Sequence, residues 1–496
     1  MSDELNFVRK ARREKLDALV AAGVAPFAYG YDRSHLAAAA SAALPDGADD
    51  GPSVRVAGRL VAWRGHGKTA FAHLADVSGR IQLYLRRDEL GDAVFDRLAL
   101  LDIGDVVGVA GSLMRTRTGE VTVRVATLEL LAKSLRPLPF GKEEVVDGVT
   151  VRHSGFTDPE QRYRQRYADL AVHPEVRALF IARSRMTSAV RGFLDGRSFL
   201  EVETPILQPM YGGAAARPFT THHNALDMPL FLRIADELNL KRLIVGGFDR
   251  VYEIGHDFRN EGLDRTHNPE FTMLELYQAY ADYEAMMTLV EELLVHVAAA
   301  VRDVPGVGDS VPAFEPPFPR ISWVGALSDS LGRDPLALDD ETLRRLVTEQ
   351  GGEATRDMSR PKLLDELFGA LVEQRIDAPT FVIDYPRELS PLAKPKRGNA
   401  ALTERFELFA NGRELANAFS ELNDPIDQRE RFEAQSTLRA AGDEEAGTVD
   451  EDYLRAMEYG MPPTGGVGIG IDRLFMYLTG TVNIRDAILF PTMRPE

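Results

Sequence analysis

The sequence predicts an α+β protein in which a small β-barrel precedes a larger domain of antiparallel strands and helices. Three observations support this prediction. Short strands separated by turns fill residues 54–133, apolar residues recur at helical spacing in 176–195 and 283–297, and two hairpins with polar faces lie at 251–277 and 406–421. With 496 residues, the chain is long enough for two to four domains and a large core.

Composition excludes several classes of protein. No apolar run approaches a membrane span, and the N-terminus lacks the pattern of a secretory signal. The absence of cysteine excludes disulfides and cysteine-ligated metal sites, and the ten histidines lack the HExxH spacing of zinc hydrolases. The net charge of −18 argues against broad non-specific nucleic-acid binding. We therefore expect a cytoplasmic protein whose partners include neither membrane nor DNA.

Residues 1–50 are predicted to form a helical extension. Residues 4–22 have one apolar face, and Gly23 with Pro26 ends the helix. The other faces carry five basic residues, which form either a solvated face or a contact with a polyanion: Arg9, Lys10, Arg12, Arg13 and Lys15. Residues 37–43 predict a second, short helix.

Residues 51–135 are predicted to form the barrel, and an OB-fold is the leading candidate. About five short strands occupy roughly 80 residues, with hairpin turns expected at Ser78-Gly79 and Thr118-Gly119. The middle strands carry Phe71, Arg80, Gln82 and Tyr84. In an OB-fold, such a face stacks unpaired bases on aromatic rings and reads their edges with polar groups. The alternative is that the two aromatic residues belong to the core.

Residues 136–165, rich in proline and glycine and without a clear period, predict a linker or wrapping loop before a second domain at 166–496. Residues 176–195 predict a helix with Gly196 at its C-cap, and residues 283–297 predict another with Asp282 at its N-cap. Residues 199–206 predict a strand that contains Pro205. Because proline cannot donate to a strand ladder, this strand should lie at an edge or an interface.

The hairpin at 251–277 is predicted to be two antiparallel strands joined by a mobile loop. Period-two alternation places Arg259 and Glu261 on one face of the first strand, and it groups four residues on one face of the second: Phe271, Met273, Glu275 and Tyr277. Carboxylates crowded in this way repel one another unless they serve a cationic ligand or a metal. The alternative is a solvated hairpin with weak exposed ion pairs.

The second hairpin turns at Asn411-Gly412, which places Glu407 and Glu414 on one face. Two such carboxylates suit Mg²⁺, although unpaired exposed glutamates are the alternative. Strict alternation puts three further polar or aromatic residues on the face opposite Glu414: Asn417, Phe419 and Glu421. If both groups line one site, either a β-bulge intervenes or one of the two assignments is wrong.

Residues 465–473 predict a strand with glycine at every second position that leads into a helix. Such a face lets a flat group, for example a nucleotide, lie against the backbone, and Arg473 at the helix start is placed to hold a phosphate. Close helix–sheet packing explains the glycines equally well.

Taken in order, the proline-containing strand, the Phe-Arg-Asn-Glu hairpin and the Gly-x-Gly-x-Gly-x-x-Arg segment resemble motifs 1, 2 and 3 of class II aminoacyl-tRNA synthetases. The resemblance narrows to the lysyl-tRNA synthetase family of the bacterial type and covers nearly the whole chain. The stretches that carry it are 212–219, 259–277, 412–424 and 466–495, with 56–88 similar to the anticodon-binding OB domain. It implies an antiparallel catalytic sheet flanked by helices.

The resemblance implies roles for the nucleotide-binding residues. Arg259 would neutralise the ATP α-phosphate and the substrate carboxylate, Phe271 would stack the adenine, and Arg473 would cover its other face near the γ-phosphate. Arg259, Arg473 and Glu261 would be catalytic. Further ATP contacts would come from Glu261, His267, Asn268 and Gly470, and Glu407 and Glu414 would bind Mg²⁺.

The resemblance implies roles for the amino-acid pocket as well. Glu237 and the Gly213 backbone would meet the α-amino group of lysine. The ε-ammonium would lie between Glu275, Tyr277 and Glu421, and Asn417 and Phe419 would shape the pocket. Phe71, Gln82 and Arg80 would bind the anticodon.

The implied activity is ATP-dependent formation of lysyl-adenylate followed by transfer to the 3′ end of tRNA(Lys), by a homodimer that meets through the Pro205 region. Two alternatives stay open. One is a lysine-type ligase that acts on a protein acceptor. The other is a non-catalytic RNA-binding paralogue.

Overall fold

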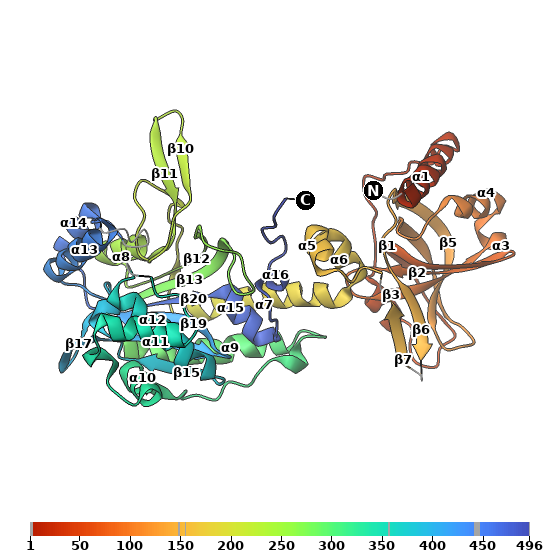
Figure 1. Ribbon diagram of the computed structural model, residues 1–496. Helices are drawn as coiled ribbons and strands as arrows, with labels where there is room; N and C mark the ends of the chain where they lie inside the picture. The colour runs from red at the N-terminus through yellow and green to blue at the C-terminus, as the bar shows by residue number, and fades with distance from the viewer. Residues whose placement is uncertain (1–2, 147–148, 154, 356–357, 441–446, 496) are drawn as a thin grey trace. The chain divides into compact units, whose positions relative to one another are not determined.

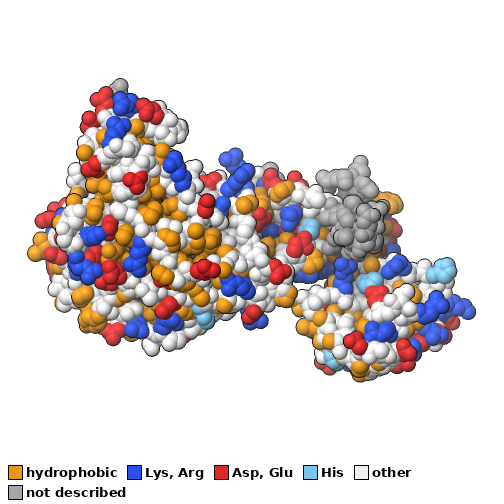
Figure 2. All heavy atoms as spheres, turned by 90° about the horizontal axis from the view of Figure 1, so that it is seen from below, with side chains coloured by type: hydrophobic (Ala, Val, Ile, Leu, Met, Phe, Trp, Pro, Cys, Tyr) orange, Lys and Arg blue, Asp and Glu red, His pale blue; other side chains and the backbone are white. Residues whose placement is uncertain are grey.

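The computed structural model describes residues 3–146, 149–153, 155–355, 358–440 and 447–495. The chain divides into two compact units, residues 1–172 and 173–496 (Figure 1). Among the described residues, none of the helices combines the length and the apolar character that crossing a membrane requires. On the face seen in Figure 2, acidic and basic side chains are interspersed, as the mixed composition leads one to expect.

The first unit is built on five strands that close into a barrel in the order β1-β2-β3-β5-β4. Their bounds are β1 Asp50–His66, β2 Thr69–Ala75, β3 Arg80–Arg86, β4 Val106–Arg115 and β5 Val121–Ala132. Alternate residues such as Leu74, Leu83 and Val123 are fully buried in the barrel core. The predicted barrel and its turns at 78–79 and 118–119 are confirmed, as are the helices α1 (Asp3–Ala21) and α2 (Ala37–Ala42).

The first unit also contains the short helices α3 (Arg87–Leu90), α4 (Asp92–Arg97), α5 (Pro159–Arg164) and α6 (Arg166–Val172). The stretch predicted to be an irregular linker instead contains an antiparallel hairpin, β6 (Lys142–Val146) with β7 (Val149–His153). Residues 147, 148 and 154 of that predicted linker lie outside the described residues. The valines at 145, 146, 149 and 151 are the β-favouring signal that the prolines and glycines around them obscured.

The second unit is organised around an eight-stranded sheet in the order β14-β15-β18-β19-β20-β13-β12-β8. The bounds are β8 Leu200–Glu201, β12 Arg250–Phe258, β13 Glu270–Ala279, β14 Arg320–Ser322, β15 Thr380–Ile383, β18 Arg405–Ala410, β19 Arg413–Ser420 and β20 Thr464–Gly470. The two predicted hairpins are confirmed, and β20 inserts between them, antiparallel to both β13 and β19.

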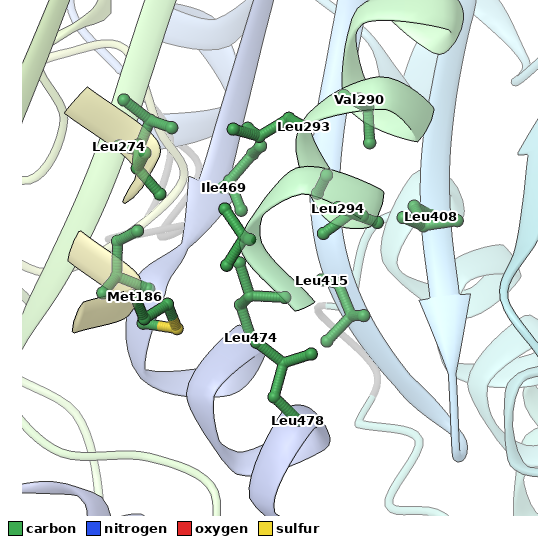
Figure 3. Packing of buried hydrophobic residues seen from close by; sticks show 14 of the residues in the cluster. Met186, Leu274, Val290, Leu293, Leu294, Leu408, Leu415, Ile469, Leu474 and Leu478 are labelled. Carbon is green, nitrogen blue, oxygen red and sulfur yellow. The ribbon is translucent and has the colours of Figure 1, made fainter. Parts of the chain in front are cut away.

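One face of this sheet packs on helices α7 (Pro174–Asp195), α9 (Tyr283–Arg302) and α15 (Ile471–Thr479). Figure 3 shows Leu293 and Leu294 of α9 pointing toward the strand residues Ile469 and Leu415, with Leu474 of α15 between them. Helix α9 begins at the predicted N-cap Asp282, whose carboxylate accepts from the backbone amides of Glu284 and Ala285. This apolar layer leaves the opposite face of the sheet for polar residues.

Two predictions for this unit are wrong in detail. The strand expected at 199–206 is only the two-residue edge strand β8, which ends at Glu201, and Pro205, which cannot donate to a ladder, lies outside it. The stretch 302–380, whose pattern with several prolines predicts less regular helical structure, also contains strand β14 and leads into β15 at Thr380; both strands are too short to show a period in the sequence.

The remaining elements surround the sheet. A three-stranded sheet has the order β10-β11-β9, with β9 Leu207–Gln208, β10 Thr220–His223 and β11 Met228–Leu232, and a two-stranded sheet pairs β16 Pro395–Lys396 with β17 Asn399–Thr403. Among the described residues, the other α-helices of this unit are α8 Glu237–Val245, α10 Trp323–Leu331, α11 Asp340–Glu349, α12 Arg360–Leu371, α13 Pro425–Ala440, α14 Glu451–Glu458 and α16 Ile484–Ala487.

Candidate active site

A cleft of about 1270 Å³ opens on the polar face of the eight-stranded sheet. Strands β13, β18, β19 and β20 contribute its floor, and α8, α12, α13 and the 259–269 loop contribute its walls. The polar row on this floor follows from the strand register, which pairs Glu407 with Asn417, Asn417 with Gly468, and Gly468 with Glu275. Residues paired in adjacent strands point to the same face, so these four side-chain positions form one line across the sheet.

A β-bulge in β19 brings Glu414 to this face. Leu408 pairs with Ala416, but the next residue, Phe409, pairs with Glu414, so the register slips at Leu415. Leu415 and Ala416 are consecutive, and both are buried in the core. The extra residue reverses the alternation, which places Glu414 on the same face as Asn417. The bulge expected from the sequence is therefore confirmed.

The alternating glycines of β20 make room for carboxylates and for an aromatic ring. A Cβ at Gly468 would lie 2.4 Å from Oε1 of Glu275, and a Cβ at Gly466 would lie 2.1 Å from Oε1 of Glu421 and 2.4 Å from the ring of Tyr277. Side chains from the two neighbouring strands thus lean over the glycine strand. This function differs from the predicted approach of a flat nucleotide to the strand, because these two glycines lie beneath the carboxylate cluster.

That carboxylate cluster forms the deep end of the cleft. Glu237 on α8, Glu275 on β13 and Glu421 beyond β19 all line it, and Glu421 is 1 % exposed. The hydroxyl of Tyr277 donates to Glu275 at 3.1 Å. Burial raises the pKa of Glu275 well above its usual range, and the negative charge of nearby Glu237 adds to this rise. The cluster therefore favours a ligand that brings positive charge.

Lys241 is the cation that the structure itself places among these carboxylates. Its side chain is fully buried, and its ammonium group pairs with Glu237 and Glu421. Burial by itself lowers the pKa of Lys241, but the two carboxylates more than offset that effect and raise it. No role was predicted for Lys241, although its spacing of four residues from Glu237 on a helix is typical of an ion pair.

The shallower end of the cleft carries two guanidinium groups. Arg259 lies over the ring of Phe271, with 5.2 Å between Cζ and the ring centroid, and its Nε donates to the carbonyl of Ile234 at 3.4 Å. Arg259 and Glu261 were predicted to share a face of the first strand. This prediction is wrong, because β12 ends at Phe258 and both residues lie in the loop that follows.

Arg473 is held by groups from two other segments. It donates to Oε2 of Glu414 at 3.1 Å, and its other terminal nitrogen lies 3.3 Å from Nε2 of His267. His267 in turn lies 2.8 Å from the carboxylate of Asp264 through Nδ1. Arg473 occupies the first turn of α15, as predicted. The loop after β12 and the glycine-rich strand thus meet at this guanidinium.

The other predicted nucleotide and amino-acid ligands also line the cleft. Asn268 is 7 % exposed, and its Oδ1 has no hydrogen-bond partner among the described residues. Gly213 takes a positive φ of +90°, which glycine adopts without strain, and it faces α8. Glu261, Gly470, Asn417 and Phe419 complete the set.

Glu407 is not the exposed, unpaired glutamate that the sequence left open. It pairs with Arg405, which lies two residues earlier on the same face, and it accepts from the hydroxyl of Tyr385 at 2.8 Å. Burial raises its pKa to about 7, with Arg405 opposing and Glu414 adding to the shift. Glu373 lies near the same carboxylates. Its burial raises its pKa to about 8, and the negative charge of Glu407 adds to this rise. These acidic groups attract a cation to this part of the cleft.

A second buried cluster lies beneath the junction of β11, α8 and β12. Arg233 is 1 % exposed and pairs with Asp236 at 2.7 Å, Glu253 at 2.6 Å and Asp257 at 3.3 Å. Burial raises the pKa of Asp236 to about 8 and that of Asp257 to about 6. The cluster ties together the segments that carry the neighbouring site residues Glu237 and Arg259.

The barrel presents a separate polar and aromatic face. Phe71 and Tyr84 are cross-strand partners whose rings stack with 4.7 Å between centroids. Both are half-buried and lie outside the barrel core, so the alternative that they are core residues is wrong. Gln82 donates to Glu120 at 2.6 Å and accepts from Thr122 at 2.9 Å. Arg80 is exposed at the start of the same strand.

Comparison with known proteins agrees with this geometry. A family model described as class II tRNA synthetases (D, K and N) matches residues 158–494, and one described as an OB-fold nucleic acid binding domain matches residues 54–137. The chain is 52 % identical to a lysine–tRNA ligase of Moorella thermoacetica over 99 % of this chain and 98 % of that protein. It is 51 % identical to that of Carboxydothermus hydrogenoformans over 99 % of each chain, and 49 % identical to that of Thermoanaerobacter pseudethanolicus over 100 % and 97 %. The chain therefore belongs to the lysine–tRNA ligase family of the class II tRNA synthetases.

Proposed function

We propose that this protein activates L-lysine with ATP and transfers the lysyl group to the 3′ end of tRNA(Lys). The observation that carries the proposal is the cleft with buried carboxylates Glu237, Glu275 and Glu421 at one end and the guanidinium groups of Arg259 and Arg473 at the other. The first end suits an amine-bearing side chain and the second suits a triphosphate.

Lysine would bind with its ε-ammonium between Glu275, Tyr277 and Glu421. The Oε1 atom of Glu421 lies against Gly466 and has no hydrogen-bond partner among the described residues, so it is available to an ammonium donor. The α-amino group would meet Glu237 and the Gly213 backbone. Asn417 and Phe419 would enclose the aliphatic part of the substrate.

ATP would bind with its adenine on Phe271 and its phosphates near Arg259 and Arg473. Glu261, His267, Asn268 and Gly470 line the same end of the cleft and would hold the nucleotide. In the first step, a carboxylate oxygen of lysine attacks the α-phosphorus, and the bond to the oxygen that bridges the α- and β-phosphorus atoms breaks. Pyrophosphate leaves with that electron pair, and the two arginines stabilise the charge that develops.

In the second step, the terminal ribose hydroxyl of the tRNA attacks the carbonyl carbon of lysyl-adenylate, and AMP leaves. No covalent bond to the enzyme is needed, because the residues of the cleft act by positioning and by fixed charge. Glu261, at the edge of the cleft beside Arg259, is proposed to act with the two arginines in catalysis.

Glu407 and Glu414 would hold Mg²⁺ together with phosphate oxygens. The fit rests on their chemistry, since Mg²⁺ commonly takes one or two carboxylates plus substrate phosphates, and both side chains line the cleft on one face of the sheet. Bound there, Mg²⁺ would neutralise phosphate charge. Arg473 donates to Glu414 and therefore lies beside the proposed cation site, where it would contact the phosphates.

The barrel would read the anticodon with the face that carries Phe71, Gln82 and Arg80. The half-exposed ring of Phe71 offers a stacking surface for a base, and Glu120 and Thr122 orient the amide of Gln82. We keep the predicted boundaries, an extension at 1–50, the barrel at 51–135, a linker at 136–165 and a catalytic domain at 166–496, as part of this proposal.

We also propose that the protein is a cytoplasmic homodimer that meets at the edge of the large sheet. Strand β8 is that edge, and Leu200, Ile206 and Leu207 around it are 46 %, 43 % and 50 % exposed. Exposed apolar residues beside an open strand edge suit a protein interface. Light scattering coupled to size-exclusion chromatography should return twice the mass of one chain.

ATP–pyrophosphate exchange measured with each of the twenty amino acids tests the proposed function. We expect exchange with L-lysine alone, followed by charging of purified tRNA(Lys). A protein-directed ligase would show exchange without tRNA charging, and an RNA-binding paralogue would bind RNA without exchange. The matching anticodon domain disfavours the first alternative, and the assembled cleft disfavours the second.

A further inference from the structure

Lys241 occupies an unusual position in a site that is built to receive a lysine. Its Nζ lies between Glu237 at the start of α8 and Glu421 after β19, and none of its side chain is exposed. The ring of Tyr277 lies 5.9 Å from the same ammonium group. One fixed cation therefore contacts two of the three carboxylates that surround the amino-acid pocket.

Lys241 offsets part of the negative charge at this end of the cleft. Glu237, Glu275 and Glu421 supply three negative charges when they are ionised, and Lys241 supplies one positive charge, so these four side chains together carry a net charge of −2. L-Lysine brings two ammonium groups, while its own carboxylate is assigned to Arg259. The neighbouring guanidinium groups have carboxylate partners of their own: Arg405 with Glu407, and Arg242 with Asp450 and Asp452.

Lys241 also constrains geometry. Two buried carboxylates that face one small volume repel each other, and a cation between them opposes part of the rise in pKa that burial causes. An ammonium group held on a buried helix ties an oxygen of each carboxylate in place. The other oxygens are then free to accept from the substrate, as Oε1 of Glu421 illustrates.

We propose that Lys241 is a specificity-determining residue: a resident counter-ion that clamps Glu237 and Glu421 and sets the pocket to accept two ammonium groups. The inference rests on the proposed function and deepens it. Lys241 does not take part in either chemical step. It positions the groups that recognise the amino acid.

Pyrophosphate exchange with Lys241→Met, which keeps the length of the side chain and removes its charge, tests this role. We expect the KM for lysine to rise by about 100-fold or more, as when one member of a buried charge pair is lost. The KM for ATP should stay within about threefold, because the nucleotide end of the cleft is intact. A merely structural role would lower the amount of folded enzyme and the apparent kcat, and it would leave both KM values unchanged.

Lys133→Met is the matched control. Lys133 is likewise fully buried and bridges two carboxylates, Asp102 at 2.5 Å and Asp105 at 2.9 Å, but it belongs to the barrel. Its loss should lower the thermal unfolding temperature and leave the KM for lysine unchanged. The comparison separates the general effect of removing a buried lysine from an effect on recognition.

The outcomes are distinct. If folded Lys241→Met shows a KM for lysine within about threefold of wild type, the clamp is refuted. If that variant does not fold, Lys241→Arg tests the proposal instead, because it keeps the charge and changes the spacing. A KM for lysine raised about tenfold or more, with the KM for ATP unchanged, supports the proposed role of Lys241. An unchanged KM for lysine overturns it. Wild-type enzyme without lysine-dependent exchange would instead sink the proposed function itself.

Discussion

Replacing Gly468 by alanine should damage the lysine pocket and spare the nucleotide site. An added Cβ would lie 2.4 Å from Oε1 and 3.0 Å from Cδ of Glu275, so that carboxylate must move. Alanine in a strand is worth about 0.5–1 kcal/mol over glycine, while overpacking costs about 1–3 kcal/mol. We expect a net loss of about 1 kcal/mol in the free energy of unfolding, which leaves the protein folded.

The larger consequence concerns recognition. A hydrogen bond to a charged group contributes about 1.5–3 kcal/mol, and about 1.4 kcal/mol corresponds to a tenfold change. Displacement of Glu275 should therefore raise the KM for lysine about 10- to 100-fold in pyrophosphate exchange, with the KM for ATP unchanged.

Gly192→Ala is the matched control for this substitution. Gly192 lies on α7, where an added Cβ meets no heavy atom within 4 Å, so this variant should keep both KM values. An unchanged KM for lysine in Gly468→Ala, or an equal rise in both KM values, would refute the assignment of Glu275 to the pocket.

Three further predictions test other parts of the molecule. Arg473→Ala should lower kcat of pyrophosphate exchange about 100- to 1000-fold with a small change in the KM for lysine; loss confined to lysine binding would contradict its role at the phosphates. Phe71→Ala should weaken aminoacylation of tRNA(Lys) by about 1–3 kcal/mol in kcat/KM for tRNA and leave tRNA-independent exchange intact, a pattern that a general folding defect cannot produce. Burial raises the pKa of Glu421 to about 8, an effect that Lys241 opposes and Glu237 strengthens. This carboxyl therefore holds its proton near neutral pH in the empty pocket and releases it when an ammonium group binds. Lysine affinity should consequently rise as pH increases toward 8, and calorimetry in two buffers of different ionisation enthalpy should register proton release; affinity that falls over this range would contradict the sign.

Local pattern alone determined much of the secondary structure. Alternation predicted the hairpins that became β12–β13 and β18–β19, and Asn411-Gly412 predicted the turn between the latter two strands. Asp282 predicted the start of α9. These features are readable because each depends on the conformational preferences of a few adjacent residues. Period two also showed that either a bulge intervenes before Asn417 or one of the two assignments on this strand is wrong, and the structure contains the bulge.

Only the tertiary structure decided which strands are neighbours and which charges meet. Period two assigns a residue to a face, but it does not say that β20 inserts between two hairpins that lie more than 100 residues apart along the chain. That insertion places Gly468 beside Glu275, and it brings Glu421 within reach of Lys241 on a distant helix. The ion pair between Glu237 and Lys241 was not predicted, although their spacing of four residues on a helix is a local signal for it. The third member, Glu421, has no such signal, because ion pairs between remote segments are set by packing of the core beneath them rather than by local preference.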